Sequence, residues 1–123
     1  MSEAIEHTML CNYIRSNFPH VVFLSDASGI KMTMGQAIKW KGMRSSNGIP
    51  DLIILCPNSI YHGLMIELKK TGEKIYKKDG SLKTEHLREQ DEVLKSLRAR
   101  GYYATFAIGF SEARDIVCQY MTK

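Results

Sequence analysis

Three charged residues stand in two short segments whose other residues are largely apolar. Asp51 lies in GIPDLIILC, residues 48–56, and Glu67 and Lys69 lie in LMIELKK, residues 64–70. Desolvating a lone carboxylate costs several kcal/mol, so burial of these groups requires partners. A divalent cation between two carboxylates would be such a partner, and oxygen ligands favour Mg²⁺ or Mn²⁺ over zinc. A lysine beside the ion could orient or deprotonate a water, or neutralise charge on a phosphate, which points to metal-assisted phosphodiester hydrolysis.

The pairing of the two segments decides whether these residues can meet. Alternate side chains of a strand share a face, so Glu67 and Lys69 point to the same side. Pro50 suits the first position of a strand, which leaves Asp51 at the mouth of that strand. If the segments pair antiparallel through PNSIYHG, residues 57–63, the two carboxylates converge. A buried ion-pair cluster or an exposed sheet edge would explain the same charges without catalysis.

A helix predicted from about residue 2 to residue 17 supplies a third acid. Its apolar face contains Ile5, Met9, Leu10 and Tyr13. Glu6 projects close to the centre of that face, where an aliphatic residue would be expected. Glu3 lies nearer the edge and also suits the start of a helix as a solvated acid, while Ser2 can act as the cap. We select Glu6 as the third carboxylate, with Glu3 as the alternative.

The rest of the chain alternates strands and helices. The pattern predicts two further strands, over 21–25 and 102–108. It also predicts a helix with Thr84 as its cap and Gly101 as its stop, and a helix over 111–121 with Ser111 as its cap. Residues 26–48 are expected to form mostly loop, although MGQAIKWKGM could form a helical turn or two. The expected order α-β-β-β-α-β-α gives a mixed sheet flanked by helices in one α/β domain, residues 1–123.

Composition restricts the classes of protein to consider. The chain has 123 residues, of which 44% are hydrophobic, and this is enough for a core without a disulfide or metal staple. Its three cysteines are widely spaced in apolar surroundings, which favours reduced core thiols and a cytoplasmic protein. The amino terminus lacks the basic region of a signal peptide, and no apolar run approaches the ~18 residues of a membrane span. We expect neither export nor membrane insertion.

The positive charges gather in two segments that bracket the acids. The net charge of +4 permits a polyanionic partner. The first segment contains Lys31, Lys39, Lys41 and Arg44, and the second contains Lys69, Lys70, Lys74, Lys77, Lys78 and Lys83. Trp40 could stack on an unpaired base or anchor its loop in the core. The DNA contacts that we select are Lys39, Trp40, Lys41, Arg44, Lys70 and Lys74.

The motif GIPD at 48–51, followed by IELK at 66–69, resembles the PD-(D/E)xK nuclease superfamily. With an upstream AIE helix, a downstream EQ helix and a GY before the last strand, the chain is similar over nearly its whole length to the virus-type replication-repair nuclease (VRR-NUC) family. The resemblance implies a restriction-endonuclease-like αβββαβ core. The stretch before GIPD is longer, and richer in glycine, methionine and lysine, than is common in relatives.

The resemblance also implies a catalytic set of Glu6, Asp51, Glu67, Lys69 and Gln90. Asp51 and Glu67 would hold Mg²⁺ or Mn²⁺ with the backbone carbonyl of Leu68, and Lys69 would be the catalytic lysine. The helical acid would assist through the metal-bound shell. Gln90 would organise the site or the DNA backbone, whereas its position alone indicates an ordinary solvated helix residue.

At the level of activity, the resemblance implies a metal-dependent DNA endonuclease of phage or prophage type, working in the cytoplasm of a bacterial host. The expected substrate is branched DNA such as a four-way (Holliday) junction, which a homodimer would cut symmetrically. A flap or restriction-like nuclease is one alternative. Another is a catalytically silent DNA-binding or assembly module on the same scaffold. The intact set of Asp51, Glu67 and Lys69 argues against the silent module, because a silent protein has no chemical reason to retain costly buried charges.

Overall fold

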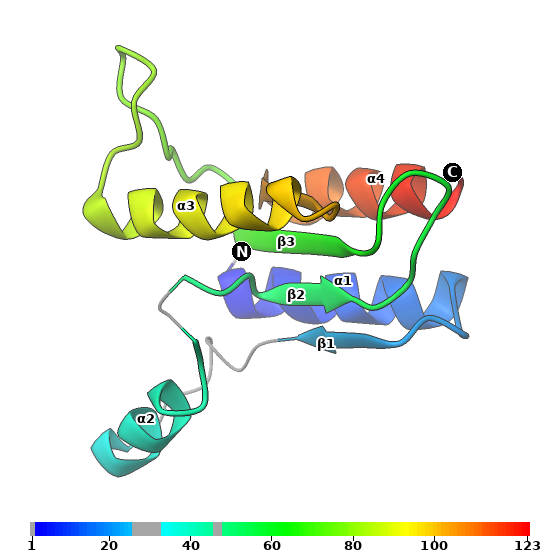
Figure 1. Cartoon of the computed structure of the whole chain (residues 1–123), viewed down its shortest axis with the longest axis horizontal. Coiled ribbons are helices and arrows are strands. Elements are labelled where there is room, and N and C mark those ends of the chain that lie inside the picture. The colour runs from blue at the N-terminus through cyan, green and yellow to red at the C-terminus, as the bar shows by residue number, and fades with distance from the viewer. Residues whose placement is uncertain (1, 26–32, 46–47) are drawn as a thin grey trace.

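A four-stranded mixed sheet lies at the centre of the computed structural model, which describes residues 2–25, 33–45 and 48–123 (Figure 1). The strands lie in the order β1 (Phe23–Ser25), β2 (Leu52–Ile54), β3 (Leu64–Lys69) and β4 (Tyr103–Ile108). β2 is antiparallel to both β1 and β3, whereas β3 and β4 are parallel. The mixed sheet that the sequence predicts is confirmed, including the antiparallel pair that carries Asp51 and Glu67.

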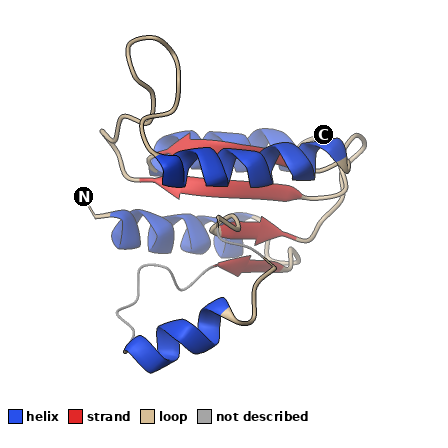
Figure 2. Ribbon diagram, turned by 60° about the vertical axis from the view of Figure 1, so that its left-hand side comes forward, coloured by secondary structure: helices blue, strands red, loops and turns tan. Residues whose placement is uncertain are grey.

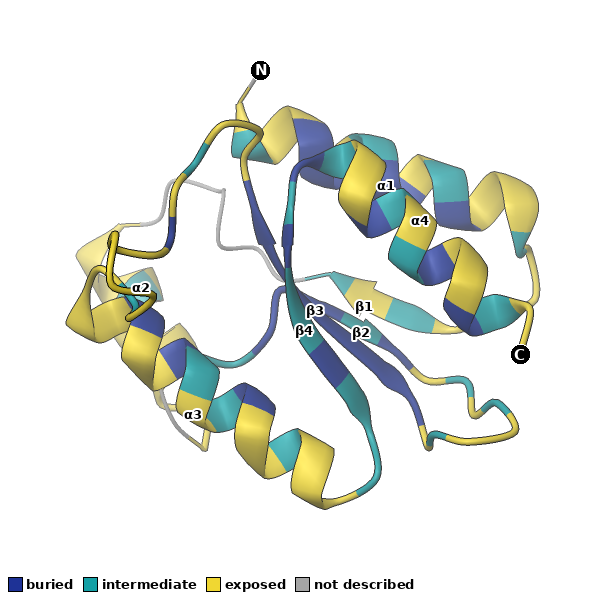
Figure 3. Cartoon of the chain, turned by 90° about the horizontal axis from the view of Figure 1, so that it is seen from above, coloured by how far each residue is buried: buried dark blue, intermediate teal, exposed yellow. Residues whose placement is uncertain are grey.

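Helices cover both faces of the sheet (Figures 2 and 3). α1 (Glu3–Asn17) and α4 (Phe110–Met121) lie on one face, and α3 (Glu85–Ala99) lies on the other. Ser2 and Thr84 cap α1 and α3 as predicted, because each hydroxyl accepts a hydrogen bond from the backbone N–H three residues later. The chain crosses from β3 through α3 to reach β4, which explains why these two strands run parallel.

The alternation of side chains along β3 separates the apolar core from the charged residues. Leu68 is fully buried in the larger core cluster, among residues of α1 and α4. Met65 faces the opposite side of the sheet and packs against Leu94 of α3. Glu67 and Lys69 share the face of Met65, because they follow it by two and four positions. The charged pair therefore lies on the α3 side, where β3 ends.

Part of the segment that was expected to be loop forms a helix, α2 (Met34–Lys41). The Thr33 side chain accepts a hydrogen bond from the Gln36 backbone N–H, and the Gln36 side chain accepts one from the backbone N–H of Thr33. This reciprocal capping box offsets the poor helix propensity of the glycine that follows Met34. α2 is the helical turn or two that MGQAIKWKGM allowed, so the expected loop is interrupted there. Residues 26–32 and 46–47 lie outside the described part of the chain.

Two expectations from composition can be compared with the structure. Cys11 is buried and Cys56 is half-buried, as expected of core thiols, but Cys118 is exposed on α4, so its expected burial is wrong. None of the three is in a disulfide. No helix among the described residues is long and apolar enough to cross a membrane.

Candidate active site

Asp51, Glu67 and Lys69 come together where β2 begins and β3 ends. The backbone N–H of Asp51 donates a hydrogen bond to Glu67 Oε2 over 3.2 Å, and Lys69 Nζ lies 3.7 Å from Glu67 Oε1. All three residues are buried, with relative exposures of 4%, 3% and 8%. The antiparallel pairing thus brings the two carboxylates to one place, and the ammonium group lies beside them.

The backbone of Leu68 adds an oxygen to this site. Its N–H donates to Asp51 Oδ2 over 3.0 Å. The N–H and C=O of one strand residue point to the same side of the strand, so the Leu68 carbonyl also faces the side of β2, beyond the point where β2 begins. Two carboxylates and one carbonyl are therefore available, and these are the oxygen ligands that Mg²⁺ and Mn²⁺ prefer.

Gln90 reaches the carboxylates from α3. It is buried between Leu87 and Leu94 on the inner stripe of that helix, and its Nε2 donates to Glu67 Oε1 in a short contact. Gln90 Oε1 is buried and has no hydrogen-bond partner among the described residues. A buried acceptor without a donor is unfavourable, and a water held in the site would supply the donor. An amide at a position of the apolar stripe is the sequence signal that could have identified this residue without a resemblance.

Burial and the neighbouring Asp51 charge together disfavour the ionised form of Glu67, in spite of the Lys69 ammonium group. Burial raises the pKa of Glu67 to about 9, with a further contribution from the negative charge of Asp51, although the Lys69 ammonium group lowers it. At neutral pH the metal-free site therefore retains a proton on Glu67. A divalent cation can replace that proton and allow both carboxylates to ionise.

Glu6 is held by donors from the protein itself. Its carboxylate accepts hydrogen bonds from Thr71 N (2.8 Å), Thr71 Oγ1 (2.5 Å) and Phe110 N (3.1 Å). Burial raises the pKa of Glu6, but these hydrogen bonds outweigh burial and the pKa is lowered. α4 begins at Phe110 after Gly109, so the prediction that Ser111 caps this helix is wrong. Glu6 supplies the acceptor instead, and its charge suits the amino terminus of α4.

Glu3, one turn earlier on α1, has the surroundings that were expected for Glu6. Burial raises the pKa of its half-buried carboxyl group, the charge of Asp51 raises it further, and Lys69 lowers it. Glu3 is therefore within electrostatic range of both residues. The structure brings Glu3 toward the paired acids, while Glu6 joins α1 to the start of α4 and to the loop after β3.

The residues selected as DNA contacts occupy two places. Lys39, Trp40 and Lys41 lie on α2, a helix with no buried residue that stands apart from the sheet (Figure 1). Trp40 does not anchor the loop in the core. The residue is 37% exposed, and the guanidinium group of Arg44 lies over its ring, 5.2 Å from the ring centroid. The exposed residues Lys70 and Lys74 follow β3 directly, beside the paired acids. Lys31 lies outside the described residues.

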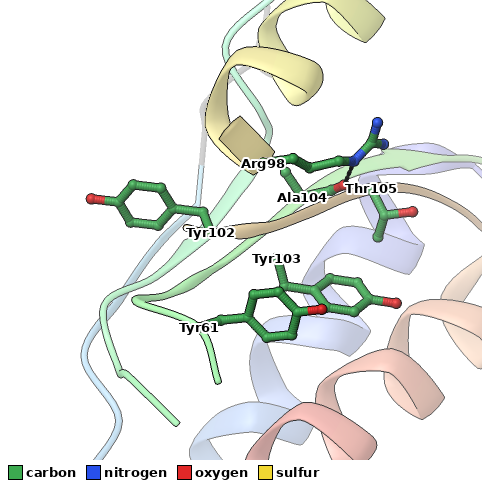
Figure 4. A pocket seen from close by; sticks show the side chains of 6 residues that line it. All are labelled: Tyr61, Arg98, Tyr102, Tyr103, Ala104 and Thr105. Atoms are coloured by element: carbon green, nitrogen blue, oxygen red, sulfur yellow. Dashed lines mark hydrogen bonds between the residues drawn. The ribbon is translucent and has the colours of Figure 1, made fainter. Parts of the chain in front are cut away.

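A hollow of about 280 Å³ lies away from these acids (Figure 4). Tyr61 and Tyr103 line it with their rings in edge-to-face contact, and Arg98 closes one side by donating to the carbonyl of Ala104 over 2.7 Å. Tyr103 is paired with Leu64 at the start of β3, so the hollow is near the opposite end of the strand from Lys69.

The residues present fit a hard divalent cation. Among the described residues, no three His, Cys, Asp or Glu side chains gather closely enough to hold one ion, so a cage built from such side chains alone is absent there. Mg²⁺ is commonly held by one or two carboxylates with water completing its shell. The paired acids, the Leu68 carbonyl and the orphaned oxygen of Gln90 match that mode of binding.

Comparisons with known proteins were made for the whole chain. No family model matches it, and no curated protein does. Among solved structures, a chain described as a "VRR_NUC domain protein" is similar, with a TM-score of 0.71 and 28% sequence identity. The match covers 99% of this chain and 89% of that one.

A mixed sheet between α1 and α4 on one face and α3 on the other, with Asp51, Glu67 and Lys69 gathered at its end, defines the restriction-endonuclease-like class of nuclease folds. Within this class the structural match supports the VRR-NUC family, and the resemblance found in the sequence motifs is confirmed. The chain is therefore similar in fold, over nearly its whole length, to a VRR_NUC domain protein.

Two residues near the site were not identified from the sequence. Thr71 joins the loop after β3 to Glu6 through both its backbone and its hydroxyl group. Glu73 contributes to the raised pKa of Glu3 and so lies within electrostatic range of it. Neither residue belongs to a periodic pattern, so spacing alone gives no signal for them.

Proposed function

We propose that this chain is a DNA endonuclease that depends on Mg²⁺ or Mn²⁺. The observation that carries the proposal is the convergence of Asp51 and Glu67, both buried, with Lys69 Nζ 3.7 Å from the Glu67 carboxylate. A purely structural ion-pair cluster would balance its charges internally. Here burial, and after it the charge of Asp51, raise the pKa of Glu67 by more than the Lys69 ammonium group lowers it.

Each residue of the site has a role in hydrolysis. Asp51, Glu67 and the Leu68 carbonyl would hold the ion, which supplies Lewis-acid polarisation of the phosphate and acidifies a bound water. Gln90 fixes the position of Glu67, and its second amide atom can accept a hydrogen bond from a water. Lys69 stabilises negative charge as the water oxygen bonds to phosphorus and the phosphorus–oxygen bond to the leaving group breaks.

We propose Glu3, rather than Glu6, as the helical acid of this site. Glu3 is within electrostatic range of Asp51 and Lys69. Both oxygens of Glu6 already accept hydrogen bonds from Thr71 or Phe110. An assisting role for Glu6 remains a prediction, and a comparison of variants at the two positions, described in the Discussion, decides between them.

Branched DNA is the substrate that we propose, with four-way junctions as the leading case and a homodimer as the active form. This part rests on the resemblance to the stand-alone nucleases of the family and on geometry, since two symmetric cuts need two sites. Light scattering on the purified chain should give the mass of a dimer. A monomer that still makes paired cuts would contradict the dimer proposal.

Cleavage of defined substrates tests the activity. The full chain is incubated with Mg²⁺ or Mn²⁺ and matched linear, flap and four-way DNA, with Asp51→Asn as the inactive control. We expect paired cuts in the four-way substrate and none from Asp51→Asn. Preference for flaps or linear duplex ends would overturn the junction proposal. Binding to junctions without cutting by the unaltered chain would favour a silent module.

A further inference from the structure

A second feature beside the paired acids is an ordered arm, residues 70–83, which we name the lysine hairpin. It contains five lysines and two acids, a net charge of +3 in a chain whose total is +4. It rises from the end of the sheet where β3 ends and stands clear of the helices (Figures 1 and 2). Most of the net positive charge of the chain is thus placed on one projecting arm.

The lysine hairpin has its own hydrogen-bonded structure. Lys83 N donates to Ile75 O (2.9 Å) and Lys77 N donates to Ser81 O (2.7 Å), which pairs the two sides around an antiparallel bridge between Tyr76 and Leu82. At the tip, the Asp79 carboxylate accepts hydrogen bonds from the N–H and the hydroxyl group of Ser81. These bonds lower the pKa of Asp79 and occupy one of the two acids.

Both ends of the lysine hairpin continue into elements that carry active-site residues. The first end follows Lys69, and Thr71 is tied to Glu6 through its backbone and its hydroxyl group. The second end leads into the cap of α3, the helix that carries Gln90. A phosphate held at the paired acids would therefore place its strand next to the start of this arm.

One aromatic side chain of the arm is presented to solvent. Ile75 is 2% exposed and anchors the hairpin, whereas the next residue, Tyr76, is 55% exposed. Exposed lysines flank the ring at positions 74, 77 and 78. Lysines that bind phosphates combined with an aromatic ring that stacks on a base are the two components of single-strand recognition.

We propose that the lysine hairpin binds the DNA strand next to the cut and that Tyr76 stacks on an unpaired base there. In a continuous duplex each base is already stacked on its neighbours, so no base face is free for the Tyr76 ring to stack on. At a branch point the continuous stack of bases is interrupted, and a single-stranded arm offers unpaired bases. The hairpin then adds affinity for DNA that is open beside the cut. The inference rests on the proposed function and names the feature of the substrate that the site selects.

Binding without divalent cations tests this separately from cleavage. The full chain in EDTA is titrated against a fork with two single-stranded arms and against a linear duplex of the same paired sequence, with fluorescence anisotropy as the readout. Tyr76→Ala should weaken binding to the fork by about tenfold and leave duplex binding within about twofold. Tyr76→Phe keeps the ring and should bind both like the unaltered chain.

The lysines are tested by the double variant Lys77→Gln/Lys78→Gln. It should weaken binding to both DNAs alike and reduce the salt slope by about two, because phosphates are common to both. Lys123→Gln, at the carboxyl terminus, is the matched control and should change neither value. Unchanged binding and salt slope in the double variant would overturn the assignment of these lysines.

A fluorescent base in the fork reports stacking directly. A 2-aminopurine in the single-stranded arm next to the branch should be quenched by the unaltered chain and by Tyr76→Phe, but not by Tyr76→Ala. Absence of quenching by the unaltered chain, or an equal loss of affinity for fork and duplex in Tyr76→Ala, would overturn the proposal. A chain that binds in this pattern but cuts no DNA with Mn²⁺ would refute the nuclease activity and leave the hairpin inference standing.

Discussion

Two acids one turn apart on α1 have different surroundings, and this separates a structural carboxylate from a functional one. Glu6 accepts three hydrogen bonds, two from Thr71 and one from Phe110. Glu6→Ala leaves these donors without an acceptor at a buried position, so we expect the free energy of unfolding to fall by about 2–4 kcal/mol. Urea unfolding measured with and without the substitution checks this value.

Glu3→Gln is the matched variant and should behave in the opposite way. Its carboxyl group has the charges of Asp51 and Lys69 as neighbours, so its loss should change stability little. We expect Mn²⁺ affinity and cleavage rate to fall by about tenfold, the usual effect of removing a group that supports metal ligands. If Glu6→Gln instead abolished cleavage at unchanged stability, Glu6 would be the helical acid and our assignment would be wrong.

The proton on Glu67 makes the stability of the metal-free chain depend on pH. The pKa of Glu67 is about 9 in the folded chain and near its usual value of 4.5 in the unfolded chain. Between these values the folded state binds a proton that the unfolded state has released, so the free energy of unfolding decreases as pH rises. We expect a loss of at least about 1 kcal/mol between pH 5 and pH 9, measured by urea unfolding in EDTA.

Glu67→Gln keeps the neutral form at every pH and is the control for this effect. It should lose less stability over the same pH range and should be more stable than the unaltered chain at the alkaline end. Equal pH slopes for the two proteins would show that Glu67 is ionised in the metal-free fold. The repulsion between the Asp51 and Glu67 carboxylates would then be balanced by another charged or hydrogen-bonding group.

At the level of elements, the contact of α3 with the GIPD segment sets the position of Gln90. Gly48 has φ +81°, and a Cβ there would lie 3.1 Å from Gln90 Cα. Gly48→Ala should therefore cost about 1–2 kcal/mol and move α3 outward, which separates Gln90 from Glu67. We expect the cleavage rate to fall further than the loss of folding stability alone would explain. Gly35→Ala in α2, where a Cβ meets nothing within 4 Å, is the matched control and should leave both unchanged or raise stability slightly.

The elements also show which features a sequence can reveal. The strands around Asp51 and Glu67 could be predicted because alternation and proline placement are local signals. The start of α4 could not, because its acceptor is Glu6, which is 104 residues away from Phe110 in the chain. α2 was expected as no more than a helical turn or two, because its glycines indicate loop and its capping box was not recognised. Glu6 was selected because it is an acid on an apolar helix face. Spacing alone cannot distinguish a carboxylate that supports a metal from one that accepts hydrogen bonds from backbone N–H groups.

For the whole molecule, the site joins every layer of the fold. β2 and β3 contribute the acids, α3 contributes Gln90 from one face, and α1 brings Glu3 from the other. An ion that binds here adds a link between elements that are otherwise held together by the apolar core. Binding and folding are therefore linked, and a ligand that binds only the folded state stabilises it by mass action.

This linkage gives a prediction for thermal stability. At a Mn²⁺ concentration about one hundred times its dissociation constant, the folded state gains about 2.7 kcal/mol, so the melting temperature should rise by several degrees. Asp51→Asn keeps the shape of the side chain and can still accept a hydrogen bond from Leu68 N, but it removes one charge from the site. Its melting temperature should not respond to Mn²⁺. Scanning calorimetry of both proteins, each with EDTA and with Mn²⁺, measures the difference. An equal rise in the two proteins would place the ion elsewhere on the molecule, and no rise in either would contradict a metal site between Asp51 and Glu67.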